Sequence, residues 1–389
     1  MTTTQFADLG VDQDLVDVLT ERGITAPFEI QALTIPDGLA SRDVCGRAKT
    51  GSGKTLAFGI PLVQLLPKAR PGRPTGLALV PTRELAVQVA RELEPLAAKR
   101  GIRTLAVYGG APIEKQISAL ARGVEFVVAT PGRMIDLIDR GELSVADVER
   151  VVIDEADRMA DMGFMPQVEW ILRRVDRNHQ TLLFSATLDG MVGGLIKRYQ
   201  NDPVMHEIAG REATVAEMEH RFLAVHEMDR VRVAVAIINS SNRTLVFSRT
   251  KWGADKLTGK LIDEGVKAAA IHGNLRQSQR EKALADFSNG RIQALVATDV
   301  AARGIHVDDV DVVIHYDPPS DAKTYLHRSG RTARAGESGV VVSLVLWNEE
   351  LEVRKLLRRL GMKVPIVAVF SNDKRLLDLQ AWDPAKEAA

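Results

Sequence analysis

Short apolar runs recur along the chain, and each is followed by a polar or glycine-rich stretch and then by a helix-like segment. Five runs lie in the first half, at Leu77–Val80, Thr104–Val107, Glu125–Val128, Val151–Ile153 and Thr181–Phe184, and five in the second half, at Thr244–Phe247, Ala268–Ile271, Ala294–Val296, Val312–Ile314 and Val340–Val345. Continuous runs rich in Val and Ile, separated by helices, are typical of buried parallel strands. The pattern therefore predicts an α/β fold that occurs twice.

The interval between the two series, residues 199–221, is polar, contains Pro203 and Gly210 and shows no strong strand pattern. We expect an interdomain linker over 208–217, a first domain over 1–207 and a second over 218–370. Residues 371–389 are expected to form a short C-terminal tail. The chain of 389 residues is long enough for two hydrophobic cores.

Charge and cysteine content limit the class of protein only weakly. Lys and Arg number 51, as do Asp and Glu, so the net charge gives no indication of a nucleic-acid partner. The single cysteine, Cys45, cannot form an internal disulfide, which favours a reducing cytoplasm. No uncharged apolar run approaches the roughly 20 residues of a membrane span, so we expect no membrane association.

The segment AKTGSGKT at residues 48–55 has the composition of a phosphate-binding loop. It follows a short strand and opens a helix, where glycines such as Gly51 and Gly53 allow backbone amides to point at phosphate oxygens. Lys54 is placed to reach the β- and γ-phosphates, and the Thr55 hydroxyl to bind Mg²⁺. The strict pattern has Gly where this chain has Ala48. The predicted nucleotide contacts are Thr50, Gly51, Ser52, Gly53, Lys54 and Thr55.

Two adjacent carboxylates, Asp154 and Glu155, follow the apolar run at 151–153. Asp154 is predicted to hold Mg²⁺, because hard cations prefer oxygen ligands. Glu155 is predicted to orient or deprotonate an attacking water. An acidic pair after a strand is often only a solvated turn, but its combination with Lys54 and Thr55 in one domain favours a nucleotide hydrolase.

The order of motifs resembles that of the DEAD-box helicases. The matching segments are Thr50–Thr55, Pro81–Ala86, Thr130–Arg133, Asp154–Asp157 (which spells DEAD), Ser185–Thr187, Gln277–Arg280, Ala297–Gly304 and His327–Arg334. The resemblance covers about Phe6 to Val345. It implies two RecA-like domains that face each other, with ATP and Mg²⁺ as cofactors and RNA as the partner.

The resemblance also assigns residues to adenine recognition. It implies that Phe6 stacks on adenine and that Gln31 binds its edge, a task suited to an amide that is both donor and acceptor. Some positions depart from the family pattern: Phe28-Glu29 replace Thr-Pro, Lys49 replaces Gln, and Ala333 replaces Gly. His306 stands where an Asp is associated with the ATP ribose, which puts the ribose contact in doubt.

The segment HRSGRTAR at 327–334 resembles the family's arginine-finger segment. Arg331 and Arg334 are three residues apart, so on a helix they share a face, and they are expected to act on the γ-phosphate when the domains close. Ser185, Thr187 and His327 resemble residues that couple the two motifs. By resemblance, the RNA contacts are Arg83, Gly110, Thr130, Arg133, Gln277, Arg280 and Thr298.

We therefore expect an RNA-stimulated ATPase that is a monomer and that couples ATP hydrolysis to local duplex unwinding or to remodelling of RNA–protein complexes. One alternative is an ATP-gated RNA clamp that unwinds little. A translocating DNA helicase is disfavoured by the DEAD sequence and by the Phe6–Gln31 segment. A metabolic P-loop kinase would not need the second α/β half. The RNA target and any protein partners are not indicated by the sequence.

Overall fold

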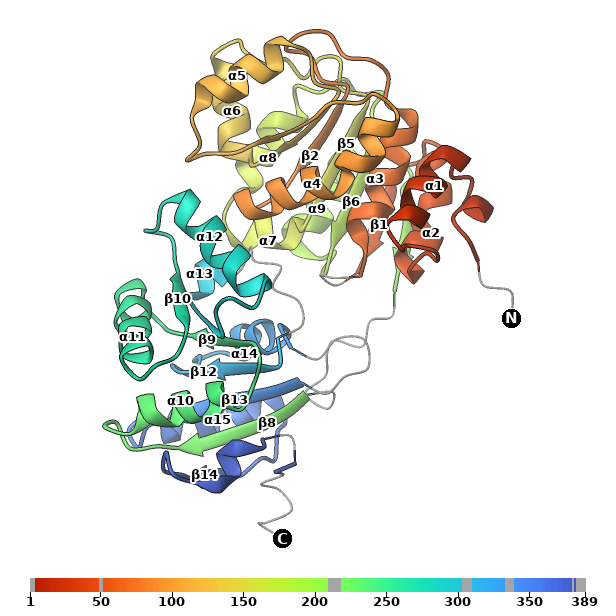
Figure 1. Ribbon diagram of the computed structural model, residues 1–389. Coiled ribbons are helices and arrows are strands. Elements are labelled where there is room, and N and C mark those ends of the chain that lie inside the picture. The colour runs from red at the N-terminus through yellow and green to blue at the C-terminus, as the bar shows by residue number, and fades with distance from the viewer. Residues whose placement is uncertain are drawn as a thin grey trace. The chain divides into compact units, whose positions relative to one another are not determined.

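In the computed structural model the chain forms two compact units, Met1–Gly210 and Arg211–Ala389. The structure describes residues 4–48, 52–208, 218–302, 310–332, 339–379 and 381–382. Within these ranges, no helix combines the length and the apolar character needed to cross a bilayer. Each unit is built on one sheet with helices around it (Figure 1).

The first unit contains a seven-stranded parallel sheet with the order β3-β4-β2-β5-β6-β1-β7. Its strands are β1 (Val44–Arg47), β2 (Gly76–Leu79), β3 (Thr104–Val107), β4 (Phe126–Ala129), β5 (Arg150–Asp154), β6 (Gln180–Ser185) and β7 (Val204–Glu207). Its helices are η1 (Ala7–Leu9), α1 (Gln13–Glu21), α2 (Glu29–Leu39), α3 (Lys54–Leu65), α4 (Arg83–Lys99), α5 (Ile113–Ala121), α6 (Pro131–Asp139), α7 (Ala156–Asp161), α8 (Met165–Leu172) and α9 (Gly190–Tyr199).

The second unit repeats this plan, with the strand order β10-β11-β9-β12-β13-β8-β14 and all neighbours parallel. Its strands are β8 (Met218–Ala224), β9 (Thr244–Phe247), β10 (Ala268–Ile271), β11 (Ala294–Ala297), β12 (Val312–His315), β13 (Gly339–Val345) and β14 (Ile366–Ala368). Its helices are α10 (Arg230–Asn239), α11 (Lys251–Asp263), α12 (Gln277–Ser288), α13 (Asp299–Ala302), α14 (Ala322–Ser329), α15 (Glu350–Leu360) and η3 (Lys374–Leu377).

Both faces of each sheet are buried, which explains why the strands are continuous apolar runs. In β2, Ala78 packs into one core of the first unit, whereas Leu77 and Leu79 pack into the other. Successive side chains of a strand point to opposite faces, so a strand covered on both sides needs apolar residues at every position. The predicted tandem of parallel-sheet domains is confirmed, and all ten predicted runs are strands whose ends agree within one residue.

The interval 199–221 holds strand residues although its sequence shows no strong strand pattern. The interval contains β7, which pairs with β1 at the sheet edge, and the start of β8, which lies between β13 and β14. Strand β8 was obscured because it buries polar side chains: His220 is 5% and Arg221 4% exposed. The expected linker at 208–217 lies outside the described residues except for Ile208, whose amide donates to Arg47 O at 3.1 Å.

The segment after residue 370 is not simply a tail. Leu376, Leu379 and Trp382 are buried in a core of the second unit. The Asp373 carboxylate begins η3 by accepting from the Arg375 amide at 3.0 Å. Apolar residues spaced by three positions let this short stretch cover α10, which the mixed charge of the segment concealed.

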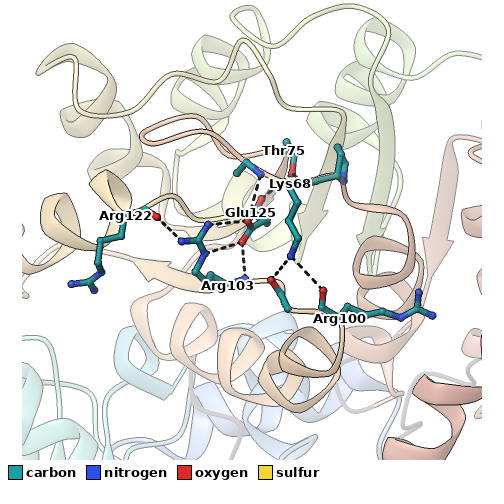
Figure 2. Close-up of polar contacts among 9 residues, drawn as sticks. Lys68, Thr75, Arg100, Arg103, Arg122 and Glu125 are labelled. Atoms are coloured by element: carbon teal, nitrogen blue, oxygen red, sulfur yellow. Dashed lines mark hydrogen bonds and ion pairs between the residues drawn. The ribbon is translucent and has the colours of Figure 1, made fainter.

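An ion pair between a buried carboxylate and a half-exposed arginine lies where the strands of the first sheet begin (Figure 2). Glu125, which directly precedes β4, is 1% exposed and pairs with Arg103, which directly precedes β3. Lys68 lies in the same region and donates to Gly101 O at 2.5 Å, beyond the end of α4. These contacts tie the loop after α3 to the beginnings of the strands, on the edge opposite to their carboxyl ends.

Candidate active site

The predicted nucleotide-binding residues follow three neighbouring strands. Residues 52–55 follow β1, the DEAD segment follows β5, and Ser185–Thr187 follow β6, in the spatial order β5-β6-β1. Because parallel strands end at the same edge, the fold brings these segments together where ligands bind in open α/β sheets. Thr50 and Gly51 lie outside the described residues.

The phosphate-loop lysine is already oriented by the protein. Gly53 has a φ of 84°, a left-handed conformation that glycine adopts without strain, and it directly precedes α3. Lys54, the first residue of α3, is 7% exposed and donates from Nζ to Ala48 O at 3.0 Å. The ammonium group is therefore held beside the loop at the positive end of a helix, where an anion is favoured.

Asp154 is a buried carboxyl group at the end of β5, with 3% exposure. Burial raises the pKa of Asp154 to about 6, Lys54 opposes this increase, and the neighbouring Glu155 adds to it. A buried carboxylate beside an ammonium group, together with the Thr55 hydroxyl in the first turn of α3, provides oxygen donors that suit Mg²⁺.

Glu155 adopts a left-handed backbone conformation, with φ 52° and ψ 48°. This conformation costs a residue other than glycine about 1–2 kcal/mol, and such strain tends to occur at functional positions. Glu155 is 5% exposed, and its carboxylate pairs with Arg158 Nη1 at 2.5 Å. Arg158 was missed in the sequence, although its spacing of three residues from Glu155 was a usable signal.

A second missed residue is Glu92 of α4. Burial raises the pKa of Glu92, and hydrogen bonding to the Thr55 hydroxyl lowers it in part. The predicted metal ligand Thr55 therefore already has a carboxyl partner. No sequence motif marks Glu92, because it lies in α4, far along the chain from Thr55 in α3.

Gln31 contacts the phosphate loop directly. Its Oε1 accepts from the Phe28 amide at 2.9 Å, and its Nε2 donates to Gly53 O at 2.9 Å. Both ends of the amide are thus engaged by the protein, so contact with adenine would require these bonds to be exchanged or shared. Phe6 is 2% exposed and lies in a core of the first unit, so its ring has no open face for stacking.

Ser185 links the DEAD segment to the following turn. Its hydroxyl accepts from the Asp157 amide at 3.1 Å and from the Thr187 amide at 3.4 Å. The serine is fully buried at the end of β6. A displacement of Asp157 would therefore be felt at residues 185–187, which is the connection that a coupling role requires.

The predicted RNA contacts of the first unit gather around residues 108–111. A side chain at position 110 would collide with the guanidinium of Arg83, so that arginine lies directly against Gly110. Arg133 donates through Nη1 and Nη2 to Ala111 O, at 3.3 Å in both cases. Thr130 begins α6 without using its side chain as a cap. Backbone and arginine groups that meet here have the chemistry of phosphate contacts.

The second unit places its predicted residues at the corresponding edge of its sheet. Gln277 begins α12 after β10, and Arg280 follows one helical turn later. Thr298 directly follows β11 and is 6% exposed. His327 lies in the last turn of α14, and the Arg331 amide donates to Arg328 O at 3.3 Å. Arg334 and His306 lie outside the described residues.

Comparison with known proteins agrees with this geometry. The family model for the DEAD/DEAH box helicase matches residues 28–192, and that for the helicase conserved C-terminal domain matches residues 228–336. The DEAD-box ATP-dependent RNA helicase CshA of Geobacillus kaustophilus is 42% identical over 344 residues, which cover 88% of this chain and 73% of that protein. CshA of Listeria monocytogenes is 39% identical over 386 residues, covering 98% of this chain and 72% of the relative.

Among solved structures, Dbp5 of Saccharomyces cerevisiae bound to RNA and ADP BeF3 is similar, with a TM-score of 0.80 and 28% identity over 96% of this chain and 100% of that chain. The shared motifs, the two parallel sheets and the similarity over most of the chain lead to one assignment. The chain belongs to the DEAD-box family of ATP-dependent RNA helicases.

Proposed function

We propose that this protein hydrolyses ATP in response to RNA and uses the cycle to open short duplexes or to remodel RNA–protein complexes. The observation that carries the proposal is a buried group of three side chains: Lys54, in the segment after β1, and Asp154 and Glu155 at the end of β5, with only β6 between these two strands. Burial of two carboxylates and an ammonium is costly unless they serve a ligand or each other. The similarity to DEAD-box RNA helicases supports ATP and RNA as the ligands.

In the proposed ATP site, Lys54 and the amides of residues 52–55 bind the phosphates. Thr55 and Asp154 would hold Mg²⁺, which when bound neutralises charge on the phosphate oxygens. Asp154 suits this role because burial disfavours its charge and a nearby cation restores it. Gln31 contributes to adenine recognition from its position on Gly53. Phe6 is not assigned to this site, since it belongs to the core.

Glu155 orients the attacking water and accepts its proton. The carboxylate must first give up or share its contact with Arg158, which pairs with it at 2.5 Å. A general base needs a free oxygen within hydrogen-bond reach of the water. We therefore expect Arg158 to hold Glu155 in place in the resting protein and to release one oxygen when nucleotide and RNA are bound.

RNA binding is assigned to two groups of residues, one in each unit. Arg83, Gly110, Thr130 and Arg133 serve in the first unit, and Gln277, Arg280 and Thr298 in the second. Arginine, threonine and backbone groups contact phosphate and sugar without reading the base sequence. Arg331 and Arg334 are proposed to stabilise charge on the γ-phosphate, and Ser185, Thr187 and His327 to couple the motifs.

The deciding experiment measures ATP turnover by the full chain with no nucleic acid, with single-stranded RNA and with single-stranded DNA of the same sequence. We expect stimulation by RNA and little by DNA. Equal rates in all three conditions would refute RNA as the activating partner, and equal stimulation by RNA and DNA would favour a DNA-tolerant helicase.

A second measurement separates unwinding from clamping. Release of a short labelled RNA strand from a duplex is compared with the lifetime of the protein on single-stranded RNA in the presence of an ATP analogue that is not hydrolysed. Strand release that depends on ATP supports the helicase. Long retention without release would favour the ATP-gated clamp. Sedimentation of the free chain tests the proposal that it is a monomer.

A further inference from the structure

Arg328 is a buried cation whose three guanidinium nitrogens are all bonded to protein oxygens. Nε donates to Asp299 Oδ1 at 2.6 Å and Nη2 to Asp299 Oδ2 at 2.8 Å, which is a bidentate pair. Nη1 donates to Asp317 O at 2.7 Å. The Arg328 side chain is 4% exposed, and its guanidinium carbon lies 5.1 Å from the centre of the Phe247 ring. Arg328 therefore cannot itself bind a ligand without dismantling this arrangement.

The two partners of Arg328 belong to segments that follow different strands. Asp299 is the first residue of α13 and directly follows Thr298, the proposed RNA contact after β11. Asp317 follows β12 by two positions. Arg328 itself lies in the last turn of α14, one residue after His327 and three before Arg331, the proposed γ-phosphate contact. One side chain thus joins the segment assigned to RNA and the segment assigned to ATP.

The bidentate geometry makes this joint stiff. A guanidinium that forms two parallel bonds to one carboxylate fixes both the distance and the relative orientation of its neighbours, whereas a lysine ammonium acts as a point charge. A displacement of Thr298 on RNA binding moves Asp299, its chain neighbour. Because the Arg328 guanidinium is buried, water cannot readily replace its bonds to Asp299, so we expect Asp299 and α14 to move together.

We propose that Arg328 is a positioning residue that transmits RNA binding at Thr298 to Arg331 through Asp299. This inference rests on the proposed function, because it uses the roles assigned there to Thr298 and Arg331. Arg328 itself contacts neither RNA nor ATP in the proposed site. Its loss removes the energetic link between the two ligands and leaves each ligand's own contacts in place.

Linkage supplies a test that does not depend on turnover. If RNA and nucleotide favour the same state, each tightens the binding of the other by the same factor. That factor is measured as the ratio of RNA dissociation constants without and with a nonhydrolysable ATP analogue and Mg²⁺, using the full chain and a fluorescent single-stranded RNA. Coupling between sites in proteins typically amounts to roughly 5–150-fold. In Arg328→Lys and in Asp299→Asn we expect this ratio to approach one, while RNA affinity without nucleotide stays within about twofold of wild type.

The stimulation of ATP turnover by saturating RNA should also fall in the same variants. The double variant Asp299→Asn/Arg328→Lys should be no worse than either single variant, because each already breaks the same pair. A matched control is Tyr325→Phe. Tyr325 is fully buried on the same helix, and its hydroxyl lies 2.7 Å from His220 Nδ1, so the variant weakens the anchoring of α14 without touching Asp299.

The control should keep a coupling ratio within about twofold of wild type even if its melting temperature falls. The inference is overturned if Arg328→Lys and Asp299→Asn keep the wild-type ratio, or if Tyr325→Phe loses it to the same degree, since loosening of α14 would then suffice. Wild-type turnover that RNA does not stimulate would instead refute the proposed function, and the inference with it. Stimulated wild-type turnover with unchanged variants refutes the inference alone.

Discussion

Removal of the Arg103 side chain should destabilise the first unit without affecting its chemistry. Arg103 donates to the buried Glu125 carboxylate from Nε at 3.3 Å and from Nη2 at 3.0 Å (Figure 2). In Arg103→Ala both bonds are lost, while the backbone amide of residue 103 still donates to Glu125 at 2.8 Å. A carboxylate that is 1% exposed then keeps its charge with only two backbone donors, the amides of residues 103 and 69.

Breaking a fully buried ion pair from one side typically costs about 3–5 kcal/mol. The Arg103 side chain is 52% exposed, so water already screens its charge. We therefore expect a loss of about 1–3 kcal/mol in the free energy of unfolding. For a unit of this size, 1 kcal/mol lowers the melting temperature by about 2–4 °C. The decrease in the free energy of unfolding in Arg103→Ala should depend on pH. Burial raises the pKa of Glu125, but the bonds from Arg103 outweigh it and leave the pKa lowered.

A carboxyl group with a lowered folded pKa stabilises the protein above its unfolded pKa of about 4.3, and this contribution disappears as the pH falls through the folded pKa. The difference between wild type and Arg103→Ala should therefore be complete at neutral pH and shrink below about pH 4. The free energy of unfolding of the first unit within the full chain is measured by urea titration. Hydrogen exchange in peptides from β3 and β4 monitors the unfolding. Arg122→Ala is the control, since only its backbone oxygen accepts from Arg103.

Arg122→Ala should stay within about 0.5 kcal/mol of wild type. Equal stability of the two variants at neutral pH would refute the reasoning. ATP turnover at a temperature where both remain folded should be unchanged, because Glu125 and Arg103 precede their strands and the active-site residues follow theirs. A large loss of turnover in a folded Arg103→Ala would show that the two edges of the sheet are not independent.

Three further outcomes are expected. Glu155→Gln should lower turnover by about 10²–10⁴-fold while nucleotide and RNA binding persist, and steady-state rates with binding titrations check this. Arg331→Ala should lower RNA-stimulated turnover by at least about 10³-fold with nearly unchanged ATP affinity, because it acts on transition-state charge; a wild-type rate would contradict its role. Burial, then Arg328 and His220, lower the pKa of His315 well below its usual value. The unfolded state then binds a proton below about pH 6.5 that the folded state does not, so the second unit should lose up to about 1.4 kcal/mol per pH unit on acidification, and His315→Asn should flatten this slope in urea titrations.

Local sequence patterns were sufficient for the strands that are apolar throughout. Thr244–Phe247 coincides with β9, all of whose residues are buried, because a strand covered on both faces is mostly apolar. Strand β8 escaped the same reasoning. It buries His220 against the Tyr325 hydroxyl and Arg221 against the Leu379 carbonyl, and both partners are more than 100 residues distant. Hydropathy along the chain cannot reveal that a polar residue will find its partner that far away.

The candidate site likewise contains some residues that the sequence indicates and others that it does not. Lys54, Asp154 and Glu155 were predictable because the chemistry imposes residue types at fixed distances from strand ends. The partners of the site were not predictable, because they depend on how helices pack. Glu92 reaches Thr55 from α4, and Gln31 reaches Gly53 from α2. The burial of Phe6 likewise follows from the packing of the amino-terminal segment and not from its position before Gln31.

The resting site holds its reactive groups in contacts that catalysis must replace. Glu155 pairs with Arg158, Thr55 with Glu92, and Gln31 with Gly53. The contacts of Glu155 and Gln31 satisfy buried polar groups that would otherwise be costly to leave unpaired in the absence of ligand. In the proposed function, nucleotide and RNA must offer better partners than these before turnover begins, so we expect the protein's own bonds to disfavour hydrolysis without both ligands. An enzyme that should hydrolyse ATP only when RNA is bound needs contacts that restrain its reactive groups in the absence of RNA. Arg158→Ala removes one of these contacts. We therefore expect it to raise ATP turnover without RNA relative to turnover with RNA. A lower RNA-free rate in Arg158→Ala would instead mean that this arginine holds Glu155 in its working position.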